Sequence, residues 1–150
     1  MKCIRQFFTA LLLCTGVTLF AQPAQSIRIL NRSNCTVYVS IQTGPNPCAW
    51  MYLSSVIAVP PGPPLFYASS TLIPGLTTFP PSLITSARIY SSTTTCGIPT
   101  TWFVGNPCTG YPLTQGFFVL NSSCFVCSQT ITANWLVAGV PGGTATLEFF

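Results

Sequence analysis

The sequence predicts an all-β protein, an antiparallel β-sandwich stapled by disulfides, with almost no helix after an N-terminal leader. Three observations carry this prediction. Apolar residues recur at every second position in several runs, an even number of cysteines follows the leader, and proline or glycine interrupts the chain at short intervals. The segments at 60–64, 74–76, 80–81 and 141–143 each contain such a break, and a helix cannot continue through them. Short strands separated by frequent turns are typical of sandwiches.

The N-terminus has the layout of a secretory signal peptide. Lys2 and Arg5 form a basic start, and an apolar stretch then runs from Phe7 to Phe20. This stretch is short for a membrane-spanning helix. We therefore expect a secreted protein, located outside the cell, at its surface or in a periplasm, with no integral membrane span in the mature chain.

The end of the leader is less sharply defined, because cleavage could follow Ala21, Ala24 or Ser26. We favour Ser26, since Ala24 and Ser26 together satisfy the small-x-small pattern of signal cleavage. The expected organisation is a signal peptide over residues 1–26 and a single domain over residues 27–150.

Period-two patterns place the expected strands. In residues 36–42, Val37, Val39 and Ile41 share one face and Tyr38 lies on the other, as in a half-buried strand. Residues 49–53 and 65–72 are ambiguous. The other segments expected to be strands are 27–30, 83–91, 101–104, 116–120, 130–138 and 144–150.

The cysteines predict a disulfide framework. Of the eight in the chain, Cys3 and Cys14 lie in the leader, which leaves six. An even number in a small exported domain indicates that all are paired. The six are Cys35, Cys48, Cys96, Cys108, Cys124 and Cys127.

Their connectivity is open, because six cysteines allow about 15 pairings. Our first choice is the local set Cys35–Cys48, Cys96–Cys108 and Cys124–Cys127, since the first two pairs each bracket a strand and a turn, "GPNPC" or "GNPC". The third pair requires "SCFVC" to form a turn. If that segment is extended, its two cysteines point to opposite faces and need other partners.

The residue inventory argues against catalysis. Glu148 is the only acidic residue, and there is no histidine. A glycosidase needs two carboxylates, and a serine or cysteine hydrolase needs a base. We therefore expect no enzyme activity, no catalytic residues and no cofactor. The "CFVC" segment lacks the helical context of a redox motif, and a zinc site made of cysteines is disfavoured by their spacing, so no metal is expected.

Charge is equally sparse. After the leader only Arg28, Arg32 and Arg88 are basic, and they form no run along the sequence. Nucleic acid is therefore not an expected partner. The candidate binding residues are aromatic, because a ring can stack on a sugar or on an apolar partner, although packing in the core is the simpler role for each ring. These candidates are Trp50, Tyr52, Trp102 and Tyr111.

The segment "IRILNRSNCTVYVS", residues 27–40, resembles the first strand of thaumatin-like proteins, which open with an apolar strand, Asn, Cys and then Thr-Val-aromatic. The resemblance implies a β-sandwich. It implies nothing about function, because the acidic cleft of that family has no counterpart here.

Two functions compete. The first is an exported, non-catalytic structural or matrix protein that self-associates through strand edges, because almost no charge protects those edges. The C-terminal run 144–150 is the expected free edge, and a homo-oligomer or surface component would result. The alternative is a monomeric secreted binding module that uses aromatic residues and loops to recognise a glycan or a protein.

Overall fold

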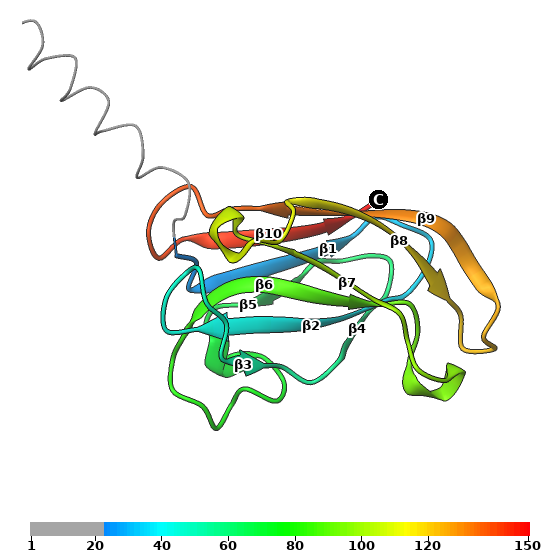
Figure 1. Cartoon of the computed structure of the whole chain (residues 1–150), viewed down its shortest axis with the longest axis horizontal. Coiled ribbons are helices and arrows are strands. Elements are labelled where there is room, and N and C mark those ends of the chain that lie inside the picture. The colour runs from blue at the N-terminus through cyan, green and yellow to red at the C-terminus, as the bar shows by residue number, and fades with distance from the viewer. Residues whose placement is uncertain (1–22) are drawn as a thin grey trace, which may run out of the picture.

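The computed structural model describes residues 23–150, which form ten strands in two sheets of five (Figure 1). The first sheet has the order β5 (Leu65–Tyr67), β1 (Ser26–Asn31), β10 (Thr144–Phe149), β9 (Val126–Leu136) and β8 (Thr114–Leu120). The second sheet has the order β3 (Tyr52–Leu53), β2 (Val37–Gly44), β6 (Leu83–Tyr90) and β7 (Thr101–Gly105), with β4 (Ile57–Val59) also paired to β2.

The prediction of an all-β chain with almost no helix is confirmed for the described residues. Their only helical segments are 3₁₀ turns of three residues each. These are η1 (Ser70–Leu72), η2 (Thr94–Cys96) and η3 (Pro107–Thr109). The two ambiguous segments contribute β3, β5 and η1, and β4 is an additional strand that the sequence pattern did not predict.

Strand β10 lies in the interior of the first sheet, between β1 and β9. The prediction that residues 144–150 form a free edge is therefore wrong. The expectation of purely antiparallel pairing is also wrong at this place, because β10 runs parallel to β1, with Ile27 opposite Ala145 and Ile29 opposite Leu147. Strand β1, from the N-terminal part of the described chain, thus pairs with one side of β10, and β9 pairs with the other.

One hydrophobic core joins the two sheets. The first sheet contributes the inward side chains of β1, β9 and β10, and the second those of β2, β6 and β7. The predicted alternation of apolar side chains is confirmed in β2, since Val37, Val39 and Ile41 are fully buried. Strand β2 departs from the half-buried expectation, because Ser40 and Gln42 on its other face are also buried.

The edge strands of the sheets differ in length between the two sides of the fold. Strands β3, β4 and β5 have two or three residues each. On the other side the edge strands β7 and β8 approach one another, and the amide of Leu120 in β8 donates a hydrogen bond to the carbonyl of Ser91 after β6 (2.7 Å). Short and covered edges are the common protection against edge-to-edge pairing.

All six cysteines of the described chain are paired, as the even number predicted, but the local connectivity is wrong. Each bond joins segments that are distant in sequence. The bonds are Cys35–Cys127, Cys48–Cys108 and Cys96–Cys124, with sequence separations of 92, 60 and 28. Residues 121–125 form the turn between β8 and β9. Cys124 lies in this turn and Cys127 lies just after it, in β9, and the two take different partners from other segments.

Three disulfides indicate folding in an oxidising environment. Most of the expected signal peptide lies outside the described residues, and its last four residues, 23–26, lie within them. Between residues 23 and 150 no helix is long and apolar enough to cross a membrane.

Candidate binding site

The outer face of the second sheet carries a continuous group of aromatic side chains around one arginine. Alternation along β6 places Arg88 and Tyr90 on this face, away from the buried Ala87 and Ile89. The pairing register sets Tyr90 opposite Tyr38 of β2.

On the other side of β6, Arg88 lies opposite Phe103 of β7. The Cζ atom of Arg88 lies 5.3 Å from the ring centre of Tyr90 and 5.7 Å from that of Phe103. The ring of Phe103 in turn stacks on Tyr111, with centres 4.9 Å apart and planes inclined by 17°. We call the row Tyr38, Tyr90, Arg88, Phe103 and Tyr111 the arginine ladder.

The loop after β7 positions the last ring of the ladder. Gly110 ends η3 in the left-handed conformation (φ 80°), which a glycine adopts without strain. The chain then turns back, and the amide of Gly105 donates to the carbonyl of Pro112 (3.2 Å), so that Tyr111 lies against β7. The bond between Cys108 and Cys48 fixes this loop to the loop after β2.

Beside Tyr111, the same two loops cover the neighbouring part of the sheet. Asn106 is buried and accepts a hydrogen bond at Oδ1 from the indole nitrogen of Trp135 (3.2 Å), while its Nδ2 donates to the carbonyl of Pro47 (3.4 Å). Under this cover Ser86 donates to Oε1 of Gln42 (2.6 Å). These side chains are therefore hydrogen-bonded within the fold.

At the other end of the ladder, Tyr38 and Tyr90 line a pocket of about 290 Å³, which we call the tyrosine pocket. Its wall is mostly apolar, and half-exposed Val56 forms part of it. The hydroxyl of Tyr90 donates to Oγ of Ser40 (3.3 Å), so the ring is held across the sheet toward β2. Tyr38 also borders a second hollow of about 320 Å³, which the Cys35–Cys127 bond and the turn at Asn121 enclose.

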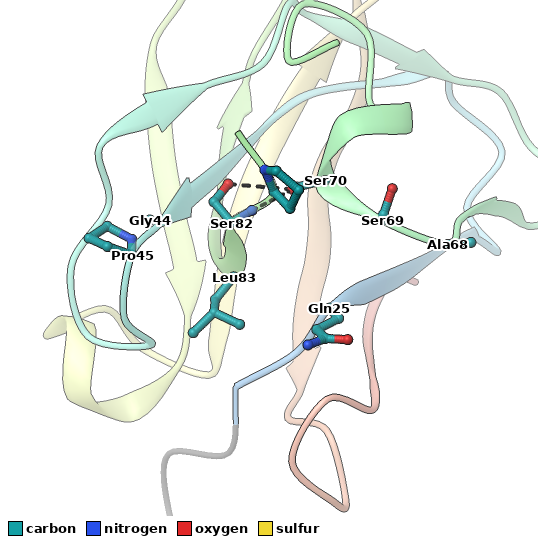
Figure 2. Close-up of a pocket in the computed structure, with 9 residues that line it drawn as sticks. Gln25, Gly44, Pro45, Ala68, Ser69, Ser70, Ser82 and Leu83 are labelled. Atoms are coloured by element: carbon teal, nitrogen blue, oxygen red, sulfur yellow. Dashed lines mark hydrogen bonds between the residues drawn. The ribbon is translucent and has the colours of Figure 1, made fainter. Parts of the chain in front are cut away.

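A larger pocket of about 420 Å³ lies away from the ladder, between Gln25, the turn at Pro45 and the residues around Ser70 and Ser82 (Figure 2). Oγ of Ser70 accepts hydrogen bonds from the amide of Ser82 (2.9 Å) and from its hydroxyl (3.4 Å). No residue that lines this pocket is charged, and the polar contact that Figure 2 shows between Ser70 and Ser82 holds two loops together. We therefore place the candidate site at the arginine ladder.

The structure separates the four aromatic residues proposed from the sequence. Only Tyr111 belongs to the ladder. Trp50 is half exposed in the loop before β3, and the ring of Tyr52 packs at a tilt of 31° against that of Phe79, with ring centres 4.6 Å apart. Trp102 packs against the core, with its ring centre 5.1 Å from that of Phe118.

Four ladder residues were not proposed: Tyr38, Arg88, Tyr90 and Phe103. A signal for the first three existed, since alternation already placed each of them on the face opposite the core residues of its strand. Nothing in the sequence indicated that β2, β6 and β7 are neighbours in this order.

The site offers stacking surfaces, phenol hydroxyls and one cation. The single carboxylate, Glu148, lies on β10 in the first sheet, 3.7 Å from Arg32. Between residues 23 and 150 no three metal-ligating side chains come together. The ladder therefore presents aromatic surfaces, phenol hydroxyls and one guanidinium on the outer face of the second sheet.

Comparison with known proteins gives no match among protein-family models, curated proteins or solved structures. The thaumatin-like resemblance of residues 27–40 thus gains no support from these comparisons.

Proposed function

We propose that this chain is an exported, monomeric, non-catalytic binding module, in which the two sheets form a disulfide-stapled β-sandwich and the arginine ladder is the recognition surface. The observation that carries the proposal is the unbroken contact of rings and guanidinium from Tyr90 through Arg88 and Phe103 to Tyr111. Because β2 and β6 are interior strands, such a surface is rigid before it binds. A rigid surface loses little conformational entropy on binding.

Two features support the remaining parts of the proposal. The basic and apolar leader together with three disulfides supports export. The interior position of β10 and the two or three residues of β3, β4 and β5 support a monomer, because they leave little edge for a second copy on that side, although β7 and β8 are longer edge strands.

A glycan array and sedimentation velocity test the proposal. We expect a monomer at micromolar concentration that binds at least one glycan class, and we expect Tyr38→Ala or Tyr90→Ala to weaken that binding. Trp50→Ala is the matched control, since Trp50 is an exposed ring outside the ladder. Binding that survives both tyrosine substitutions but is lost in the control would overturn this assignment.

A structural or matrix role is the second candidate, because one observation favours it. Ile98 is fully exposed and Phe125 is 72% exposed, and both lie on loops that the Cys96–Cys124 bond ties together. Apolar side chains held outward on rigid loops favour association. Sedimentation velocity tests this role. If the wild-type protein forms oligomers and the double variant Ile98→Ser with Phe125→Ser is a monomer, the structural role is established instead.

A further inference from the structure

Arg88 has no acidic partner anywhere in the chain. The only carboxylate side chain of the 150 residues is that of Glu148, and it lies 3.7 Å from Arg32 in the structure. Arg88 instead contacts the rings of Tyr90 and Phe103. Its positive charge is therefore uncompensated on a face that is otherwise neutral.

The nitrogen atoms of Arg88 point to the same conclusion. Its Nε is buried and donates a hydrogen bond to no atom of residues 23–150. A buried donor without an acceptor is costly, and the cost is larger for a charged group.

Stacking prepares the guanidinium for one type of acceptor. Rings beside a guanidinium stabilise it by cation–π attraction and limit its rotation. A planar guanidinium presents a fork of N–H donors that matches the two oxygens of a carboxylate. The ladder therefore combines flat apolar surfaces with a preorganised carboxylate receptor.

We propose that the arginine ladder binds an acidic carbohydrate, in which Arg88 holds the carboxylate of a uronic acid while Tyr38 and Tyr90 stack on the sugar rings beside it. The inference rests on the proposed function and names its ligand class. A sugar ring has one face of C–H groups that packs on aromatic rings and hydroxyls that the phenol groups can bind.

Other anionic ligands fit less well. A peptide that adds a strand needs a free sheet edge. Tyr38, Arg88 and Tyr90 lie on β2 and β6, which are paired on both sides, and only Phe103 lies on an edge strand, β7. A single-stranded nucleic acid needs a basic groove along its backbone, and the ladder holds one arginine.

The experiment titrates the full exported protein with a galacturonate hexasaccharide and with its methyl ester, which keeps the sugars and removes the charge. We expect the acid to bind at least about tenfold more tightly than the ester, because hydrogen bonds to charged groups are strong. Arg88→Gln should remove this preference, and Arg88→Lys should keep part of it because the charge stays. Arg28→Gln is the matched control, since Arg28 is an exposed arginine on β1 in the other sheet.

Each outcome of the titration supports or overturns the acidic carbohydrate as the ligand. Equal binding of acid and ester, or a preference that survives Arg88→Gln in a folded variant, overturns the acidic ligand while the binding module stands. If neither saccharide binds, a carbohydrate is not the ligand. Binding of poly-glutamate that depends on Arg88 would then identify an acidic peptide as the ligand. Circular dichroism and the melting temperature of each variant show that a loss of binding is not a loss of fold.

Discussion

Cys48 is bonded to Cys108, and this bond joins the two segments of the chain that read "GPNPC" and "GNPC". The similar segments are thus partners, and neither closes a local hairpin of its own. A second pair of similar segments is linked in the same way, because Cys35 of "ILNRSNC" is bonded to Cys127 just after "VLNSSC". In both pairs the bond crosses a long stretch of sequence. The two bonds lie near opposite ends of β2, because Cys35 precedes this strand and Cys48 follows it.

The first prediction concerns this connectivity. Proteolysis of the unreduced protein should release peptides that link Cys48 to Cys108, Cys35 to Cys127 and Cys96 to Cys124. The double variant Cys48→Ala with Cys108→Ala should lose about 4 kcal/mol in the free energy of unfolding, because the bond closes a long loop. Mass spectrometry of the peptides and urea unfolding provide the two measurements. A peptide that links Cys35 to Cys48 would contradict the connectivity.

The sequence was informative about strands because side chains alternate across a sheet. Val37, Val39 and Ile41 mark the core face of β2 in the sequence, and the structure buries all three. The sequence does not show which strands pair with one another, because the hydrogen bonds between neighbouring strands are made by the backbone and carry little sequence information. Nothing in residues 144–150 indicates that β1 pairs with them in parallel.

The arginine ladder could be predicted from the sequence only in part, for the same reason. The positions of Arg88 and Tyr90 on one face follow from their spacing of two on β6. Their contact with Phe103 depends on the register between β6 and β7, and the stacking of Tyr111 depends on a loop that a disulfide holds. These relations arise only when distant segments meet.

The second prediction compares the two asparagines of the linked segments. Asn106→Ala should lower the free energy of unfolding by about 2 kcal/mol, because it leaves the buried indole N–H of Trp135 without its acceptor. Asn46→Ala should lower it by only about 0.5 kcal/mol, since Asn46 is exposed and accepts one hydrogen bond from the amide of Cys48. Urea unfolding of both variants measures the difference. Equal losses would show that the contact with Trp135 contributes nothing.

The third prediction concerns alkaline pH. Burial raises the pKa of Tyr67 in β5 above its ordinary value of 10.0. The folded state therefore keeps this proton to higher pH than the unfolded state, and the free energy of unfolding should fall as pH rises through about 10 toward the folded pKa. Below that range Tyr67 should have no effect on the pH dependence.

Urea unfolding at a series of pH values tests this sign. Tyr67→Phe removes the phenol and should make the loss of stability between about pH 9 and pH 11 shallower than in the wild type. A loss as steep in the variant as in the wild type would contradict a role for Tyr67.

The fourth prediction concerns where the mature chain begins. The carbonyl of Ala24 accepts a hydrogen bond from the amide of Ile84 (2.9 Å), and Ala24 itself is buried. The hydroxyl of Ser26 lies 2.7 Å from that of Thr144. Cleavage after Ser26, which the sequence pattern favoured, would remove these contacts, whereas cleavage after Ala21 would keep them. From the structure we therefore expect the mature chain to begin at Gln22 and not at Ile27.

N-terminal mass spectrometry of the exported protein identifies the cleavage site directly, and two truncated chains test its physical reason. A chain that begins at Ile27 should be less stable than one that begins at Gln22 by about 2 kcal/mol, because several hydrogen bonds to residues 23–26 are lost. The amide of Gln25, which donates to the carbonyl of Gly143 (3.1 Å), is one of these groups, and its loss should loosen the turn before β10. Faster hydrogen exchange at Gly142, whose amide donates to Pro23 (2.8 Å), should therefore accompany the truncation. Equal stability of the two chains, together with an exported chain that begins at Ile27, would show that residues 23–26 belong to the leader.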